Sequence, residues 1–264
     1  MPTTTDFFSY EELTWPDVAA LPRDTPLIIS LGEGYDREKL ASALGNPPRA
    51  GLLPSIPFGW RGSGLTVPEA LLGQLVANLL DSLRDDGFSR VYALTPQAID
   101  LGLGAQRIAL PHVSQFIPEP LLPGPDALDK VVLIPIGHTE QHGFHLPLST
   151  DTLIIGHIGR ETAVSHPTIA TSLPVFPYGV STHRQAFAGT LNCGGRAFED
   201  FWLGVIDVLA GRGFSKLYLM SGHGGNVSFL VNTIKYAGER HRRIFCATAW
   251  LHTSGKQGAA AIEK

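Results

Sequence analysis

The sequence predicts an α/β protein with a mainly parallel sheet, because apolar runs of strand length alternate with stretches of helical periodicity. The clearest strands are residues 131–136 and 214–220, and each leads into a loop that carries glycine and histidine. The clearest helices are residues 66–83 and 198–209, in which large apolar residues recur every three or four positions. We expect parallel strands joined by right-handed crossovers.

The first expected elements lie between residues 27 and 94. Residues 27–32 are an apolar run that ends in glycine, and residues 90–94 are a second strand. Between them, residues 66–69 (Thr-Val-Pro-Glu) have the pattern of a capping box with proline in the first turn. The apolar face of the helix that follows consists of Leu72, Leu75, Val76, Leu79, Leu80 and Leu83. We interpret this face as core packing.

Three segments of the first half recur in the same order in the second half. The matched pairs are 27–32 with 132–137, 53–59 with 173–179, and 87–92 with 213–218. We therefore predict an internal duplication, with a degenerate copy without the metal motif at residues 1–125 and a metal-binding copy at residues 126–264. Residues 118–125 are too rich in proline for a helix or an inner strand and form the expected linker. Glu33 and Asp36 of the first copy are interpreted as surface carboxylates; the alternative is that they are leftover ligands, but no histidine remains to join them.

The most informative segment follows the strand at residues 131–136. Glu140 and His142 are two positions apart, so their side chains point the same way in an extended segment. Asp151 can return to the same place after the turn at Pro147. Carboxylate oxygens and imidazole nitrogens are the ligands that zinc, manganese and iron accept. We predict a metal site here; the alternative is a polar loop whose side chains only satisfy backbone groups.

A second motif, residues 221–226 (Ser-Gly-His-Gly-Gly-Asn), follows the strand at residues 214–220. Its glycines allow a tight turn with His223 at the tip of the strand. A glycine-rich phosphate loop is the alternative. Neither GxxxxGK[ST] nor GxGxxG occurs here, however, and a phosphate loop needs no central histidine. We expect His223 to be a fourth metal ligand.

These motifs resemble those of a known family. Residues 137–151 resemble the signature of the creatininase (creatinine amidohydrolase) family, and residues 221–226 resemble its second motif. Residues 177–181 and 187–190 resemble the segment between them, so that the resemblance covers about 129 to 250. It implies a three-layer α/β/α sandwich, usually assembled as hexamers. It also implies metal-dependent cleavage of non-standard or cyclic C–N amide bonds, since the family includes creatininases, formylamide hydrolases and a peptidase of redox-cofactor maturation.

The resemblance also assigns roles to residues. The implied ligands of one or two divalent ions (zinc, manganese or iron) are Glu140, His142, Asp151 and His223. Asp151 would bridge two ions. A bound metal lowers the pKa of a water molecule and polarises a carbonyl group, so three of these ligands are also expected to be catalytic: Glu140, His142 and His223. His145 is expected to orient a ligand, with a structural hydrogen bond as the alternative, and Ser181 is expected to contact the substrate.

Two departures from the family pattern bear on activity. Gly225 stands where creatininase itself has a further glutamate, so creatinine is not the expected substrate. Other members have glycine there and a later His-Ala-Gly-x-x-Glu segment with a catalytic histidine and glutamate; we find none before Lys264, and the surroundings of His252 do not match. Three hypotheses follow. The chain is an amidohydrolase of a small-molecule amide or lactam, with a non-peptide C–N bond; it is an inactive metal-binding or structural subunit; or a partner chain completes its site.

The bulk properties fit an enzyme of the cytoplasm. The net charge is −4, with lysine and arginine scattered along the chain, which predicts no nucleic-acid partner. No apolar stretch approaches the ~20 residues of a membrane helix, and the first residues do not resemble a signal peptide. Cys193 and Cys246 do not make a disulfide framework, so we expect a reducing compartment. The family resemblance adds the expectation of a homo-oligomer.

Overall fold

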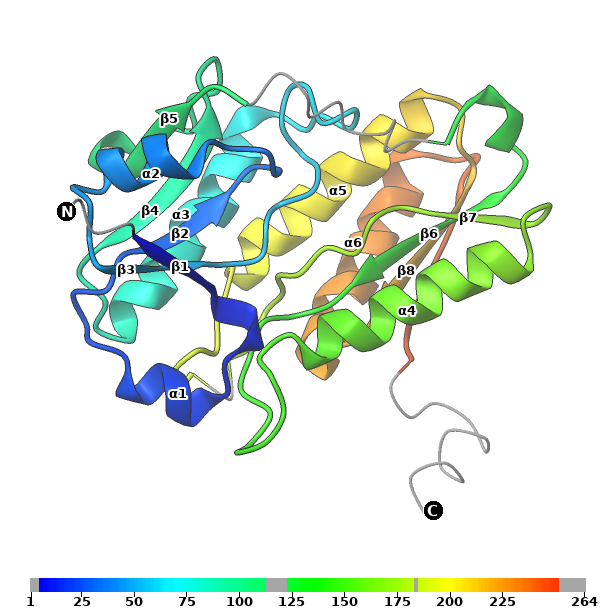
Figure 1. Ribbon diagram of the computed structural model, residues 1–264. Coiled ribbons are helices and arrows are strands. Elements are labelled where there is room, and N and C mark those ends of the chain that lie inside the picture. Colours follow the sequence, from blue (N-terminus) through cyan, green and yellow to red (C-terminus); the bar gives the residue numbers. More distant parts are fainter. Residues whose placement is uncertain (1–4, 113–122, 183–184, 252–264) are drawn as a thin grey trace.

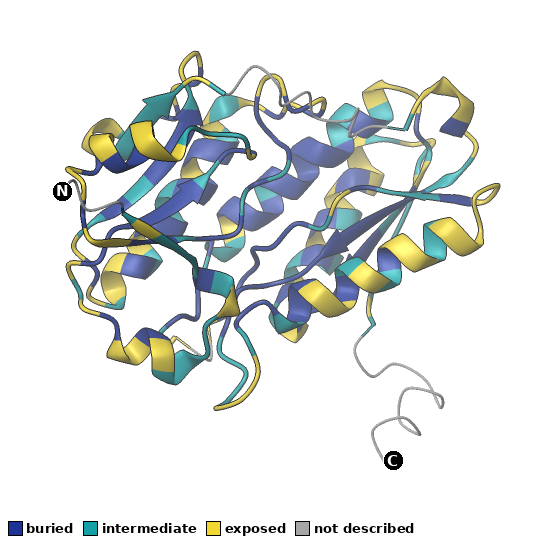
Figure 2. Ribbon diagram, viewed as in Figure 1, coloured by how far each residue is buried: buried dark blue, intermediate teal, exposed yellow. Residues whose placement is uncertain are grey.

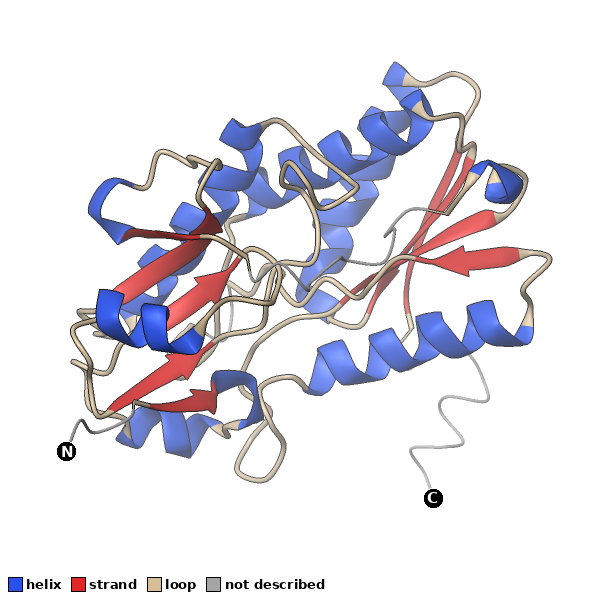
Figure 3. Cartoon of the chain, turned by 45° about the horizontal axis from the view of Figure 1, so that its top comes forward, coloured by secondary structure: helices blue, strands red, loops and turns tan. Residues whose placement is uncertain are grey.

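The computed structural model describes residues 5–112, 123–182 and 185–251. Its strands form two sheets, and all the pairings between named strands are parallel. The first sheet has the order β1-β3-β2-β4-β5 and consists of β1 (Asp6–Ser9), β2 (Leu27–Ser30), β3 (Arg49–Leu52), β4 (Val91–Pro96) and β5 (Arg107–Leu110). The second has the order β7-β6-β8-β9 and consists of β6 (Val131–Ile136), β7 (Ala170–Ser172), β8 (Lys216–Ser221) and β9 (Phe245–Trp250). The expected α/β class with parallel strands is confirmed, and Figure 3 shows the strands as two separate groups.

Helices cover both faces of the sheets, which explains why the inner strands read as continuous apolar runs. The helices are α1 (Trp15–Ala20), α2 (Arg37–Ala43), α3 (Glu69–Asp85), α4 (Thr150–Ser165), α5 (Gly195–Gly211) and α6 (Val227–Arg240). In β2, Ile28 packs in a cluster with α2, whereas Ile29 belongs to the main core with α3. In β6, Leu133 packs in a cluster with α4, whereas Ile134 belongs to the main core with α5. Because neighbouring strand residues point to opposite faces, α2 and α4 cover the faces opposite to α3 and α5 (Figure 1).

A single hydrophobic core joins the two halves of the chain. The apolar face of α3 is fully buried in the same cluster as the apolar face of α5, which includes Phe198 and Trp202. In Figure 2 both helices are coloured largely as buried, and they lie beside each other in the middle of the molecule. Both helix faces are therefore core packing, as the sequence predicts, and each half buries the other's helix layer.

The start of α3 differs from the prediction. The helix begins at Glu69, Pro68 occupies the N-cap position, and the described residues provide no side-chain hydrogen bond to cap it. Thr66, the expected cap, instead donates its hydroxyl to the carbonyl oxygen of Trp60 at 3.3 Å. Asp36 has more than a surface role, since its carboxylate caps α2 by accepting from two backbone N–H groups.

The proposed duplication agrees with the sheet orders but stays a proposal. Strands β3-β2-β4-β5 and β7-β6-β8-β9 follow the same order, and α3 and α5 occupy corresponding places in the chain. The halves differ between their last two strands, where the second has α6 and the first has only the short 3-10 helix Gly104–Gln106. Most of the expected linker at residues 118–125 lies outside the described residues.

None of the helices in the described ranges is long and apolar enough to cross a membrane. Both cysteines are free. Cys193 is buried, and burial raises the pKa of its thiol.

Candidate metal centre

The end of β6 lies directly against the start of α4. A Cβ atom on Gly137 would be 2.5 Å from the Cα of Thr152, so only glycine permits this approach. The hydroxyl of Thr152 donates to the carbonyl oxygen of His138 at 3.1 Å. Asp151 lies in the first turn of α4, one residue before Thr152. The close approach therefore holds the loop that follows β6 beside the Asp151 carboxylate.

The end of β8 also lies beside Asp151 and the loop that follows β6. Strands β6 and β8 are parallel neighbours, so their carboxyl ends lie at one edge of the sheet, where α/β proteins bind ligands. A Cβ on Gly222 would be 2.7 Å from the carbonyl oxygen of Asp151, which again requires glycine. The hydroxyl of Ser221 accepts from the His223 N–H at 3.2 Å and donates to the His223 carbonyl oxygen at 2.7 Å. These contacts fix the turn that carries His223.

All four predicted ligand side chains meet at this edge. His223 Nδ1 lies 3.0 Å from Glu140 Oε1 and 3.1 Å from Asp151 Oδ2. His142 Nε2 lies 3.0 Å from Asp151 Oδ1. Glu140, Asp151 and His223 are buried and His142 is half-buried. The two oxygens of Asp151 thus face one imidazole each.

Both imidazoles are held at one nitrogen by the backbone and offer the other nitrogen to the carboxylates. His142 Nδ1 donates to the carbonyl oxygen of Glu140 at 3.0 Å. His223 Nε2 donates to the carbonyl oxygen of Val180 at 3.1 Å. A carbonyl oxygen only accepts, so these bonds fix which ring nitrogen is free to bind a metal. Metal-ligating histidines almost always have such a partner behind the ring.

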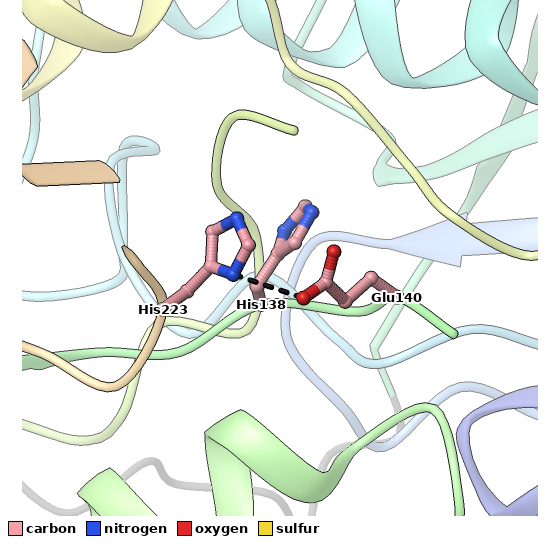
Figure 4. Close-up of side chains that lie close together, drawn as sticks. All are labelled: His138, Glu140 and His223. Atoms are coloured by element: carbon pink, nitrogen blue, oxygen red, sulfur yellow. Dashed lines mark ion pairs between the residues drawn. The ribbon is translucent and has the colours of Figure 1, made fainter. Parts of the chain in front are cut away.

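His138 joins the cluster although the sequence analysis did not assign it as a ligand. Its ring is 0% exposed, and its centroid is 4.4 Å from that of His223. One of its ring nitrogens lies within 4.8 Å of a carboxylate oxygen of Glu140 and a ring nitrogen of His223. Figure 4 shows the three side chains together. The signal was available, because residues 138, 140 and 142 alternate and share one side of an extended segment.

The remaining expected site residues have different surroundings. The hydroxyl of Ser181 is buried and donates to Glu140 Oε2 at 3.1 Å, so it orients the carboxylate. His145 is exposed, and its described ring contact is with Phe144, with 6.5 Å between the centroids. The substrate contact of Ser181 and the orienting role of His145 stay predictions.

Asn226 ties the three sequence motifs together. Its side-chain oxygen accepts from the Val180 N–H at 2.9 Å, and its amide donates to the Gly137 carbonyl oxygen at 3.3 Å. A Cβ on Gly179 would lie 2.3 Å from this side chain, so Gly179 is required for the contact. The buried amide therefore fixes the distance between the ends of β6 and β8 and the segment between them.

The first half of the chain forms backbone hydrogen bonds to the loop between β6 and α4, residues 137–149, which we call the metal loop. The N–H groups of Leu148 and Ser149 donate to the carbonyl oxygens of Leu13 (2.9 Å) and Glu11 (3.1 Å). These bonds join the loop before α4 to the segment between β1 and α1. The half that lacks the metal motif thus positions the loop that carries it.

The charges of the cluster suit a divalent cation. Burial opposes ionisation of Asp151, but hydrogen bonds from His142 and His223 lower its pKa to about 2. Burial alone would lower the pKa of His223, but hydrogen bonds to Asp151 and Glu140 raise it to about 9. The pKa of His138 falls to about 3 because the ring is buried and faces His223, which leaves it neutral and able to bind a metal. A cation can replace the proton on His223 and remain paired with both carboxylates.

This ion-pair cluster predicts a pH dependence for the metal-free protein. The pKa of His223 is raised from 6.5, so its contribution to stability is complete below about pH 6.5 and is lost as pH rises through about 9. Urea unfolding in a chelating buffer should show wild type more stable than His223→Gln at pH 6, with the gap narrowing by pH 9.5. A gap that stays constant between these pH values would contradict the expected protonated His223.

Comparisons with known proteins agree with the sequence resemblance. The chain is 38% identical over 115 residues to the mycofactocin precursor peptide peptidase of Mycobacterium ulcerans (strain Agy99), a match that covers 39% of this chain and 44% of the relative. It is 28% identical over 134 residues to the creatinine amidohydrolase of Pseudomonas putida, covering 46% of this chain and 51% of the relative. The chain thus spans about half the length of the curated relatives it matches. A solved structure titled "Creatininase Mn" has 25% identity and a TM-score of 0.48, and covers 52% of this chain and 58% of that chain.

The family model described as creatinine amidohydrolase matches residues 124–263, which is more than half of the chain. The matched region contains the loop after β6 with Glu140 and His142, Asp151 of α4, and His223, which follows β8. The chain belongs to the creatininase family.

Proposed function

We propose that this protein is a metal-dependent hydrolase that cleaves an amide C–N bond. The observation that carries the proposal is the pair of imidazoles, His142 and His223, each held at one nitrogen by a carbonyl and facing carboxylates with the other. Ordinary surface ion pairs lack this arrangement, whereas metal centres use it. The proposed ligands are Glu140, His142, Asp151 and His223, binding one or two ions of zinc, manganese or iron.

The chain's own residues fit this chemistry. A bound divalent metal supplies an acidified water and polarises the substrate carbonyl. Asp151 Oδ1 faces His142 and Oδ2 faces His223, so the carboxylate is placed to serve two ions. The Ser181 hydroxyl holds the Glu140 carboxylate in position. Burial of these groups lowers the local dielectric constant and strengthens their interaction with a cation.

The proposed substrate is a small-molecule amide or lactam other than creatinine. A Cβ on Gly225 would lie 2.3 Å from the Val180 carbonyl oxygen and 2.4 Å from His223 Nε2. This backbone therefore has no room for the additional glutamate that the family resemblance associates with creatinine. One relative is named a peptidase, so the restriction to non-peptide bonds stays a prediction, and peptide amides belong in the test.

Assembly and location are further proposals. We propose that the protein forms a homo-oligomer. The main alternative to activity of the isolated chain is a site that a second copy or another chain completes. Phe144 on the metal loop is 67% exposed and Leu146 is 50% exposed, and such apolar side chains beside a site favour contact with another surface. Activity per subunit that rises with protein concentration would support this alternative. A cytoplasmic location stays a prediction.

The test of the function is hydrolysis by purified protein with and without added zinc, manganese or iron. The panel comprises creatinine, lactams, formamides, open-chain amides and short peptides. We expect metal-dependent release of amine from at least one non-creatinine amide and no turnover of creatinine. If metal-loaded protein turns over no substrate at any concentration tested, the inactive metal-binding subunit becomes the better hypothesis.

A further inference from the structure

We propose that His138 is an additional protein ligand of the metal centre, which gives the ion beside His223 a second imidazole. The inference rests on the metal site of the proposed function but not on catalysis. The ion would be bound by His138, Glu140, Asp151 and His223. His138 is outside the ligand set that the family resemblance implies.

The first step is the state of the His138 ring. The side chain is completely buried, and neither ring nitrogen has a hydrogen-bond partner within the described parts of the chain. Leaving a buried polar group without a partner destabilises the folded state, and most buried polar groups in native proteins are paired. A metal ion at this place would pair one nitrogen.

The second step is that the ring is held where a metal would need it. The His138 carbonyl oxygen accepts from Thr152, and the preceding Gly137 N–H donates to the Phe176 carbonyl oxygen at 2.8 Å. These bonds fix the backbone on both sides of the Cα. From this fixed backbone, the ring lies at an angle of 33° to the ring of His223, beside the Glu140 carboxylate (Figure 4).

The third step is the composition of the resulting site. The described side chains form two groups of three possible metal ligands. The first group is His138, Glu140 and His223, and the second is Glu140, His142 and Asp151. Glu140 is common to both groups. Asp151 Oδ2 lies 3.1 Å from His223 Nδ1, so Asp151 is a neighbour of the first group and the proposed fourth ligand. Imidazole suits zinc and iron, whereas manganese is better served by oxygen ligands. His138 should therefore shift the preference of this position toward zinc or iron over manganese.

The experiment measures metal binding without an activity assay. Wild type, His138→Ala and His138→Asn are stripped of metal, and zinc and manganese affinities are measured by competition with a chromophoric chelator. We expect both variants to bind zinc about 10-fold more weakly or worse. Loss of a residue that only hydrogen-bonds to a metal ligand already lowers metal affinity by about 10-fold or more. Manganese affinity should fall less. The matched control is His157→Ala, which removes an exposed histidine from α4 and should change neither affinity.

Spectroscopy decides between a ligand and a packing role. The visible absorption of the cobalt-loaded protein and X-ray absorption of the zinc-loaded protein, at one equivalent, should show one imidazole fewer in folded His138 variants than in wild type. Unchanged affinity and spectra in folded variants would overturn the inference and leave His138 as a packing residue. That result leaves the hydrolase proposal standing, while a wild type that binds metal through His138 but hydrolyses no amide would refute only the hydrolase.

Discussion

Replacing His223 or Glu140 with alanine should lower the rate of amide hydrolysis on the order of 10³-fold or more. Each side chain is a proposed metal ligand at the shared edge of β6 and β8, and His223 Nδ1 lies 3.0 Å from Glu140 Oε1. Loss of either removes metal and, with it, the acidified water and the polarised carbonyl. General acid–base help alone is worth about 10²–10⁴-fold, so loss of the whole centre should be at least as costly.

The measurement is kcat/KM on the best substrate of the panel, with each variant loaded at the same free metal concentration. Circular dichroism and the urea midpoint check that the variants fold. Matched controls are Glu161→Ala and His166→Ala, which remove an exposed carboxylate and an exposed imidazole of α4 and its C-cap. Controls as impaired as the site variants, or site variants with near-normal kcat/KM, would contradict the assigned catalytic roles.

The parallel strands and the helix faces were predictable because they depend on local pattern. The runs at β6 and β8 are apolar on both faces, and the stripes of α3 and α5 repeat at helical spacing. The start of α3 was not predictable in the same way. Thr66 has the right spacing for a cap, but the tertiary turn at Trp60 supplies a competing carbonyl oxygen for its hydroxyl. Division of the strands into two sheets likewise depends on how the helix layers pack, which no local pattern encodes.

In the candidate site, too, the features set by local sequence were predictable, and those set by tertiary contacts were not. Alternation along the chain predicts that Glu140 and His142 point together, and the glycines of residues 222–225 predict the sharp turn of His223. The role of Asn226 in joining the motifs was missed, because it depends on hydrogen bonds to Val180 and Gly137, which are distant in sequence. His138 was missed for a related reason. Its alternation with Glu140 was visible, but its burial and its lack of hydrogen-bond partners among the described residues depend on tertiary packing.

Replacing Asp151 with alanine should remove most of the bound metal. Wild type, purified gently, should carry about one to two equivalents of zinc, manganese or iron, which is the number the candidate ligand groups suggest. Asp151 offers one oxygen toward His142 and the other toward His223, so its carboxylate is in contact with both imidazoles. Loss of Asp151 should therefore weaken metal binding beside both His142 and His223, whereas loss of His142 should weaken mainly the binding of one ion.

Elemental analysis of wild type, Asp151→Ala, Asp151→Asn and His142→Ala distinguishes these cases. We expect the order of retained metal to be wild type, then His142→Ala, then Asp151→Ala. Asp151→Asn should resemble the alanine variant, because a neutral amide keeps the shape but offers no negative charge to the cation. Asp200→Ala is the control, since this carboxylate pairs with exposed Arg196 on α5 and should leave the metal content unchanged. Full metal content in Asp151→Ala would contradict the shared role of Asp151, and would place the ion in the group of His138, Glu140 and His223 alone.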